Sequence, residues 1–531
     1  MKKSPFLAAL LGSAALLAHT PASAGWFEPT FTLEALGTYE SGVFDESAAE
    51  IVAYDPRTRR AFVVNANDQT VDVLDISDPT EPTLVTAINV SDAADSLGAA
   101  NSVAIARGIL AVAIERDPSQ MNGVVAFYDT DTLSLLNTVE VGALPDMVTF
   151  TPDGKTVLVA NEGEPDDDYV VDPEGSVSVI DLRRGVTRAR VRTATFGKFN
   201  RKKDKLLRKG VRIFGPNATV AQDLEPEYIT VDSRGRFAYV ALQENNALAV
   251  VNIAKAKVTK LLPLGTKDHS AVGNEMDASN RDDAINIRSW PVVGMYQPDA
   301  IASYSRWGRT YIVTANEGDS RDYDGFSEEE RVGDLMLDPN DYPDAAELQL
   351  DENLGRLQSA TATGDTDGDG LIDLIHSYGA RSLSIWDSKG RQIWDSGNAL
   401  ESITANLDPD NFNSTNDEND SFDNRSDDKG PEPEGVAIGR VLGQTLAFVG
   451  LERVGGIAVY NVTNPYAPSF QSYINTRDFS VEDVEAGGAG DLGPEGLTFV
   501  PWYYSPTWRP LLIVGSEVSG TTTIYQVRIS F

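Results

Sequence analysis

Acidic residues recur at two fixed points of a repeated pattern in this sequence. One point is the start of a predicted strand, and the other is the end of the next strand. The strand starts supply Glu50, Asp146, Glu227, Asp299, Glu434 and Glu495, and the second-strand ends supply Glu115, Glu162, Glu244, Glu317, Glu452 and Glu517. Clustered carboxylates repel one another unless cations, protons or arginines offset them, and Arg321 and Arg453 are nearby candidates. Oxygen ligands favour Ca²⁺ or Mg²⁺. The alternative is that single acids cap turns by accepting backbone hydrogen bonds.

A second group of acids has the spacing of a calcium-binding loop. Residues 364–375 read GDTDGDGLIDLI, in which acids alternate around glycines that permit a sharp turn. The predicted ligands are Asp365, Asp367, Asp369, Leu371 through its carbonyl oxygen, and Asp373. His376 stands at the twelfth position, where an EF-hand has a bidentate glutamate. We therefore expect an EF-like or thrombospondin-type calcium loop, with a merely polar turn as the alternative.

The elements that position these acids form a repeat of strand, tight turn, strand, loop and strand. The clearest copy has strands at 147–150, 156–160 and 176–180, and PDGK at 152–155 forms its tight turn. Seven copies can be traced. In a propeller blade the second strand runs back antiparallel to the first, so both acidic points meet on one face. We predict an all-β fold, a seven-bladed β-propeller with long acidic loop insertions, in preference to a β-sandwich, and we expect residues 31–40 to pair with the last blade.

The mature chain, residues 25–531, is predicted to be a single domain with large insertions at about 268–296, 319–380 and 400–430. Long polar insertions are either functional or disordered. For the acidic stretch 411–434, an ordered loop and a disordered linker both stay open. The basic stretch 183–212 is expected to form an outer strand and a connection, either as a solvated face or as a contact for a polyanion or phosphate.

Composition and the N-terminus indicate export. Residues 1–24 have a charged start, an apolar stretch at 6–18 and a small-residue cleavage site at 22–24, which is typical of a signal peptide. No later segment is apolar enough to cross a bilayer. The net charge of −36 argues against nucleic acid as a partner. The chain has no cysteine and three histidines, which argues against thiolate, zinc and haem chemistry. We expect a monomer in the periplasm or outside the cell.

Several longer strings resemble the choice-of-anchor I family. They are AAEIVAYD, YQPDAIASY, TANEGDSRDY, GDTDGDG, ARSLSIWD, NSTNDENDSFDNRSDDKGPEPEGV and GPEGL. The resemblance covers about residues 31–527. It implies a YVTN/WD-like seven-bladed propeller in an extracellular setting, related to the mesenchyme-specific cell surface glycoproteins of biomineralising animals. It also implies a link to calcium or mineral, and some relatives carry the label alkaline phosphatase.

Two functions of different classes follow. The first is an exported calcium-binding propeller that serves adhesion, matrix or mineral contact. The second is a calcium-dependent phosphomonoesterase, similar to alkaline phosphatase or phytase, in which carboxylates hold ions that bind phosphate and activate water. Thr314, Ser320 and Arg321 lie beside Glu317 in TANEGDSR and would be mutated first. No catalytic residue is identified, so enzymatic activity stays open. The expected partners are divalent cations, with phosphate esters, polysaccharide or a mineral surface as further candidates.

Overall fold

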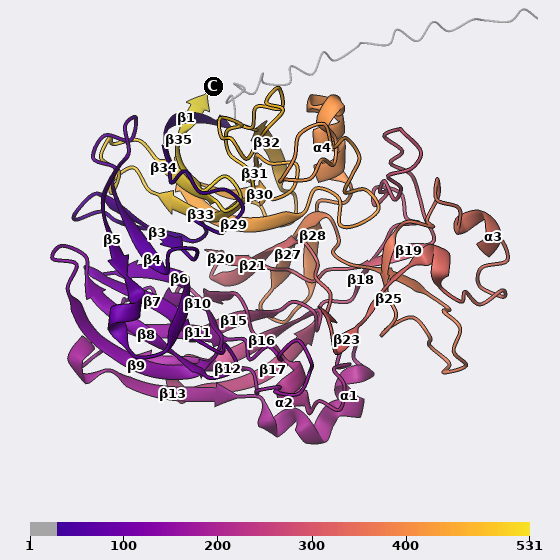
Figure 1. Cartoon of the computed structure of the whole chain (residues 1–531), viewed down its shortest axis with the longest axis horizontal. Helices are drawn as coiled ribbons and strands as arrows, with labels where there is room; N and C mark the ends of the chain where they lie inside the picture. The colour runs from indigo at the N-terminus through magenta and orange to yellow at the C-terminus, as the bar shows by residue number, and fades with distance from the viewer. Residues whose placement is uncertain (1–28) are drawn as a thin grey trace, which may run out of the picture.

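The computed structural model describes residues 29–531, and β-strands dominate it. The predicted signal peptide, residues 1–24, lies outside the described residues. Figure 1 shows the sheets arranged around a common centre, with the chain colour advancing in order around the ring. The all-β prediction is therefore confirmed.

Seven four-stranded antiparallel sheets are present within residues 29–531. Sheet 1 contains β2 (Val52–Asp55), β3 (Arg60–Asn65), β4 (Thr70–Asp75) and β5 (Thr83–Asn89). Sheet 2 contains β6 (Leu97–Ala106), β7 (Ile109–Arg116), β8 (Asn122–Asp129) and β9 (Leu135–Ala143). Sheet 3 contains β10 (Pro145–Phe150), β11 (Thr156–Asn161), β12 (Ser176–Asp181) and β13 (Arg190–Thr195). Sheet 4 contains β14 (Ile229–Val231), β15 (Phe237–Leu242), β16 (Ala247–Asn252) and β17 (Lys257–Pro263).

The last three sheets complete the ring. Sheet 5 contains β20 (Ile301–Arg306), β21 (Arg309–Asn316), β27 (Ser382–Asp387) and β28 (Gln392–Asp395). Sheet 6 contains β29 (Pro433–Val441), β30 (Gln444–Leu451), β31 (Ile457–Asn461) and β32 (Ser469–Ile474). Sheet 7 contains β33 (Pro494–Val500), β34 (Leu511–Ser516), β35 (Thr521–Ser530) and β1 (Thr30–Glu40). The first strands of successive sheets contact one another, and β2 contacts β33, which closes the ring as in a β-propeller.

Strand β1 closes the ring, as the sequence predicts for residues 31–40. It pairs antiparallel with β35, with Phe31 opposite Ile529 and Thr38 opposite Thr523, and the two strands lie side by side in Figure 1. Sheet 7 thus joins the first strand of the chain to the last three. The pairing removes an exposed sheet edge and ties the two ends of the described chain together.

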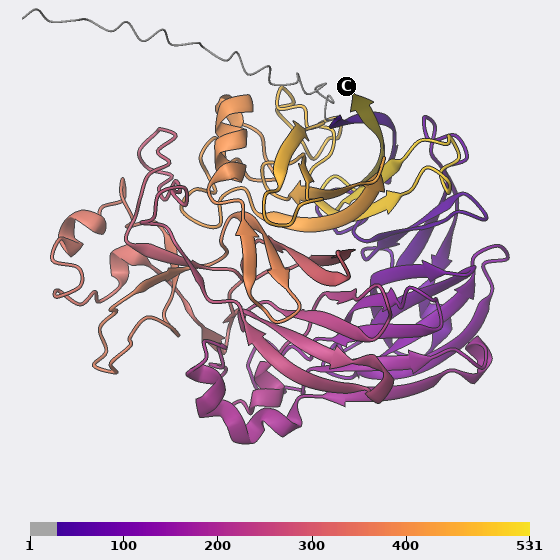
Figure 2. The same cartoon turned by 180° about the vertical axis from the view of Figure 1, so that it is seen from behind.

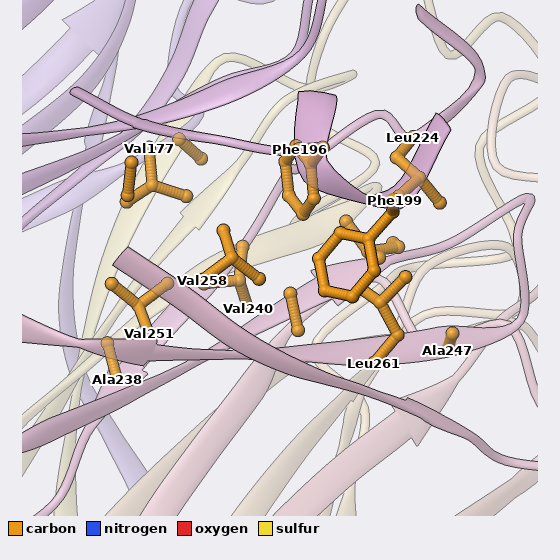
Figure 3. Close-up of a cluster of buried hydrophobic side chains, with 14 of the residues drawn as sticks. Val177, Phe196, Phe199, Leu224, Ala238, Val240, Ala247, Val251, Val258 and Leu261 are labelled. Atoms are coloured by element: carbon orange, nitrogen blue, oxygen red, sulfur yellow. The ribbon is translucent and has the colours of Figure 1, made fainter. Parts of the chain in front are cut away.

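The inner strands are apolar along nearly their whole length because neighbouring sheets cover both of their faces. In β11, every residue from Val157 to Asn161 is buried. Figure 3 shows the packing between sheets 3 and 4, where Val177, Val240, Phe196 and Phe199 belong to one buried cluster. These phenylalanines belong to the basic stretch, which forms outer strand β13 and then α1 (Lys203–Leu207), before α2 (Val220–Asp223). The charged stretch is therefore attached by its own apolar side chains.

The insertions are folded against the ring. Residues between β17 and β20 and between β21 and β27 form small sheets and one short helix: β18 (Thr266–Asp268), β19 (Val292–Met295), β22 (Asp322–Tyr323), β23 (Phe326–Ser327), β24 (Glu329–Arg331), β25 (Gln358–Ala360), β26 (Ile375–Ser377) and α3 (Ala345–Leu348). Figures 1 and 2 both place α3 at the side of the ring. Helix α4 (Ala399–Leu407) precedes the acidic stretch 411–434, in which Phe412 is fully buried. That stretch is an ordered loop.

Candidate metal centre

The two acidic points of the repeat meet because of the strand register. In sheet 3, Pro145 at the start of β10 lies opposite Asn161 at the end of β11. Asp146 directly follows Pro145 and Glu162 directly follows Asn161, so the two acids lie at the same end of the sheet. Sheets 6 and 7 repeat this pairing with Pro433 opposite Leu451 and Pro494 opposite Ser516. In all three sheets the register shifts immediately after the proline. We call this face of the ring the mouth.

The predicted carboxylates form compact groups at the mouth. In each group the candidate ligand atoms lie within 4.8 Å of one another. The groups are Glu50, Glu495 and Glu517 (group A); Glu162, Glu227 and Glu244 (group B); Asp299, Glu317 and Glu434 (group C); and Glu317, Glu432 and Glu452 (group D). Glu432 was not predicted. Every group joins acids from two or more sheets or from the segments that lead into them.

Of the four groups, group B best fits a cation site. Glu227 and Glu244 are only 7% and 6% exposed, and the Oε2 atom of each has no hydrogen-bond partner within the described chain. Such an oxygen in a buried place loses its water without replacement, which is unfavourable unless a cation or a proton occupies the site. Glu162 completes the group.

A cavity of about 430 Å³ opens beside group B. Its lining combines the group B acids with further predicted and unpredicted polar residues: Asp146, Glu162, Glu164, Glu227, Gln243, Glu244, Asp299, Asp319, Ser320, Asp322 and Tyr323. All of these side chains offer oxygen atoms. The cavity could therefore admit a hydrated divalent cation and supply most of its ligands.

Burial and mutual repulsion raise the pKa values of these acids. Burial, followed by the nearby Glu164, raises the pKa of Asp146 to about 7. Burial raises the pKa of Glu50 to about 8, with a smaller contribution from Glu517. Burial and then the charge of Glu244 hold the pKa of Glu227 well above its usual range. These acids thus bind protons at a pH where exposed carboxyls are ionised.

The carboxylates also act on one another across the mouth. The pKa of Glu495 is raised first by burial and then by Glu50, Glu517, Asp299 and Asp146, which come from different sheets. Acids from several sheets can raise the pKa of one carboxyl only if their charges lie around a shared space. The convergence that the repeat predicts is therefore present. Glu115 also lies near this space, where its carboxylate accepts a 3.4 Å hydrogen bond from the amide of Ala99.

Several basic side chains neutralise part of the mouth. The predicted Arg321 is fully buried, donates to Glu225 at 2.7 Å and lies 3.3 Å from Asp223. The predicted Arg453 lies 3.2 Å from Glu432 and 3.1 Å from Glu452. Two further bases, Arg425 and Lys429, were not predicted; Arg425 lies 2.8 Å from Glu432.

Lys429 reaches the mouth from the acidic loop 411–434. Its ammonium lies 2.6 Å from Glu317 and 3.2 Å from Glu432. Its position as the single lysine of the acidic run SDDKGPEPE is a signal that could have drawn attention to it. Thr314, selected for its place in TANEGDSR, is buried and donates to Asn316 at 2.7 Å, so it lies in the sheet interior rather than at the mouth.

The predicted calcium loop lies apart from the mouth groups and is exposed. The carboxylate of Asp365 accepts hydrogen bonds from the amides of Gly368 and Gly370, at 2.6 and 3.0 Å. The charge of Asp369 raises the pKa of Asp367, which shows that the loop acids lie near one another. Leu371, the predicted carbonyl ligand, donates a 2.9 Å hydrogen bond from its backbone amide to the Asp369 carboxylate.

Asp373 has neighbours that the local pattern could not reveal. Its carboxylate forms a group with Asp338 and Asp341, whose ligand atoms lie within 4.8 Å of one another. The same carboxylate accepts a 2.7 Å hydrogen bond from the amide of Thr366. Asp373 therefore joins the loop to a second segment of the same insertion.

Comparison with known proteins places the chain among relatives. Residues 50–465 match the model of the choice-of-anchor I domain. The chain is 34% identical over 191 residues to gigasin-3a of Magallana gigas, covering 34% of this chain and 67% of that protein. It is 30% identical over 367 residues to the mesenchyme-specific cell surface glycoprotein of Strongylocentrotus purpuratus, covering 60% of this chain and 45% of that protein. The chain thus spans less than half of the second relative.

Solved structures share only a distant likeness. Kuenenia stuttgartiensis hydrazine synthase has a TM-score of 0.46 at 12% identity, covering 92% of this chain and 99% of the other. The Cps50 (Swd1) β-propeller domain of Myceliophteria thermophila has a TM-score of 0.43 at 8% identity, covering 94% and 100%. None of the helices within residues 29–531 combines the length and apolar character needed to span a bilayer. The match to the domain model extends over most of the sequence, and the chain belongs to the choice-of-anchor I family.

Proposed function

We propose that this protein is an exported, extracellular seven-bladed β-propeller that binds Ca²⁺ at its mouth and serves in adhesion, matrix or mineral contact. The observation that carries the proposal is the pair of buried, unpartnered carboxylate oxygens of Glu227 and Glu244. The signal-like residues 1–24 support export. The name of the cell surface glycoprotein relative supports an extracellular setting.

The bases at the mouth offset only part of the charge of group B, because burial holds the pKa of Glu244 above its ordinary value although Arg321 lowers it. Arg321 is engaged by Asp223 and Glu225, and Lys429 by Glu317 and Glu432. The remaining ways to offset the charge of group B are protons and a bound cation. A cation with several oxygen ligands stabilises all three carboxylates at once, whereas one proton neutralises one of them. Calcium is preferred to zinc because the groups at the mouth contain only oxygen donors.

The loop Asp365–Asp373 is the second proposed calcium site. The proposal is supported by the alternating spacing of the loop acids and by their proximity. Asp338 and Asp341 lie beside Asp373 and are candidate additional ligands of the ion. This site is exposed, so we expect it to be weaker than the mouth, where burial strengthens the attraction between cation and carboxylate.

Calorimetric titration of metal-depleted mature protein with CaCl₂, and separately with MgCl₂, tests the proposal. We expect calcium to bind, to release protons and to raise the unfolding midpoint, because a ligand of the native state stabilises it. The matched variants are Glu227→Gln at the mouth and Glu81→Gln at an exposed position. Absence of calcium binding to the wild-type protein, or equal binding by both variants, would contradict the mouth site.

A calcium-dependent phosphomonoesterase is the alternative function, favoured by one observation. The cavity beside group B is also lined by Ser320 and Tyr323, so a phosphate bound through calcium would meet two hydroxyl groups. Clustered ions can bind phosphate and activate water. The test is hydrolysis of p-nitrophenyl phosphate and of phytate in calcium and in chelator. Turnover that is lost in chelator and in Glu227→Gln supports this alternative, and no turnover with calcium bound excludes it for these substrates.

A further inference from the structure

A second cleft lies on the face opposite the mouth and has the opposite charge. The strands that start at the mouth end at this other face, where tight turns such as 232–236 and 307–308 connect them to the second strands. Between sheets 4 and 5 these turns enclose a cleft of about 690 Å³. This volume falls in the range of small-molecule sites, about 300–1,000 Å³.

The cleft is basic in a strongly acidic protein. Five basic and two acidic side chains line it: Arg236, Lys260, Arg309, Lys389, Arg391, Asp232 and Asp387. The two acids are already used, because Asp387 lies 2.6 Å from Arg391 and Asp232 lies 3.7 Å from Arg236. The other three bases have no ion-pair partner among residues 29–531. The chain as a whole has 80 acidic and 44 basic residues, so three unpaired bases in one cleft contrast with the overall charge of the protein.

A buried hydroxyl group lines the same cleft without a partner. Tyr311 is 1% exposed, and its hydroxyl lies near the side chains of Tyr466 and Arg309 but makes no hydrogen bond of normal length within the described chain. A buried hydroxyl normally has a partner because losing its water is unfavourable. A ligand in the cleft would provide one. This observation is independent of the charge of the cleft.

Aromatic rings form a platform at the edge of the cleft. Tyr466 lines it from the loop after β31, and Trp307 stacks on Tyr466 with ring centroids 6.5 Å apart. Both rings are exposed, at 52% and 62%. Trp307 and Gly308 form the two-residue hairpin turn between β20 and β21, and this turn gives Trp307 its positive φ of 51°. The turn thus holds the Trp307 ring at the edge of the cleft.

We propose that this basic cleft binds an anionic sugar unit, a hexose that carries a carboxylate or a sulfate. Arg309, Lys389 and Lys260 would bind the anionic group through charge-assisted hydrogen bonds, Tyr311 would donate to a ring oxygen or hydroxyl, and Trp307 with Tyr466 would cover the apolar face of the ring. The net charge of −36 repels long polyanions, so a short or terminal unit fits better than an extended polymer or nucleic acid.

This proposal is independent of the proposed calcium function, and its test is done in chelator so that calcium at the mouth cannot bridge the ligand. Calorimetry would compare a uronate tetrasaccharide, a sulfated tetrasaccharide, neutral maltotetraose and inorganic sulfate. We expect at least one anionic sugar to bind, with affinity that falls as salt is raised, and neither maltotetraose nor sulfate to match it.

The variants separate a site from general charge attraction. Arg309→Gln/Lys389→Gln and Trp307→Ala should each weaken sugar binding at least tenfold. Lys205→Gln/Lys209→Gln removes the same charge from exposed residues outside the cleft and should leave binding unchanged. Because all these positions are exposed, unfolding midpoints near that of the wild type should confirm folding. No binding of either anionic sugar, equal loss in the lysine control, or equal binding of maltotetraose would overturn the proposal, and sulfate as strong as the sugars would reduce it to an anion site.

Discussion

Replacing Glu227 with glutamine should stabilise the metal-free protein and abolish its response to calcium. Glutamine has nearly the same shape but no charge, so it removes repulsion from Glu244 and Glu162, whose ligand atoms lie within 4.8 Å. Substitution of a buried polar residue usually lowers the stability of a protein. An increase in stability on mutation is therefore a specific sign that the native carboxylate is uncompensated without metal.

The size of the effect follows from the raised pKa of Glu227. A like charge at this distance raises a carboxyl pKa by about 1–3 units, and one unit corresponds to about 1.4 kcal/mol. Allowing for partial protonation at pH 8, we expect Glu227→Gln to gain about 1–3 kcal/mol without metal. For a domain of this length the unfolding entropy is about 1 kcal/mol per kelvin, so the midpoint should rise by about 1–3 °C. Calcium at about 100 times its dissociation constant adds about 2.7 kcal/mol to the wild type.

Differential scanning calorimetry of both proteins at pH 8, in chelator and in calcium, measures both effects. The control Glu81→Gln makes the same chemical change at an exposed residue and should alter neither midpoint by more than a few tenths of a degree. If Glu227→Gln is less stable than the wild type in chelator, the carboxylate has a stabilising partner and the reasoning fails. If the variant keeps the full calcium response, Glu227 is not a ligand.

Further predictions concern pH, ring closure and the loop. Burial raises the pKa of Glu50 to about 8 and that of Asp146 to about 7. Above about pH 4 the native protein therefore binds more protons than the unfolded chain. The stability of the metal-free protein should fall as the pH rises to about 8. Midpoints recorded from pH 5.5 to 8.5 check this, calcium should flatten the dependence, and a rise with pH would contradict it. Phe31→Ala, in the fully buried ring of β1, should destabilise by about 3–5 kcal/mol in urea unfolding, whereas Thr30→Ala at an exposed site should not. Asp367→Ala should remove one calcium equivalent in calorimetry, and an unchanged stoichiometry would leave the loop as a polar turn.

The sequence was most informative where the chain repeats itself. A proline followed by an acid, and an acid after the next strand, can be assigned to one face because antiparallel register relates them, as Asp146 and Glu162 show. The closing strand at residues 31–40 was predicted on other grounds, because this segment alternates and precedes the first full unit of the repeat. The repeat also predicted that acids from different sheets would converge, since equivalent positions of a ring share one face.

The insertions were less predictable because no repeat fixes their place. Lys429 and Asp319 reach the mouth from long connections, and a local pattern carries no information on the fold of such segments. The partners of Asp373 show the same limit. Its own loop was recognised from spacing, but Asp338 and Asp341 lie more than thirty residues earlier and become neighbours only through the folding of the insertion.

The unequal distribution of bases predicts that two buried glutamates at the same mouth respond to mutation with opposite signs. Glu432 is fully buried and lies close to Arg425, Lys429 and Arg453, at 2.8, 3.2 and 3.2 Å. Burial alone would raise its pKa, but these three bases outweigh burial and lower the pKa to about 2. Its carboxylate therefore already has the neutralising charge that Glu227 lacks.

Glutamine at position 432 would remove one carboxylate partner from each of three half-buried bases, at a site where the glutamate itself is fully buried. Breaking a buried ion pair from one side is destabilising by about 3–5 kcal/mol. Glu432→Gln should therefore lower the midpoint in chelator, whereas Glu227→Gln should raise it. The calcium response of Glu432→Gln should stay close to that of the wild type, because a cation has little to gain beside Lys429. Destabilisation by both variants would mean that the mouth is neutralised evenly by protein groups, and the case for calcium at group B would then be lost.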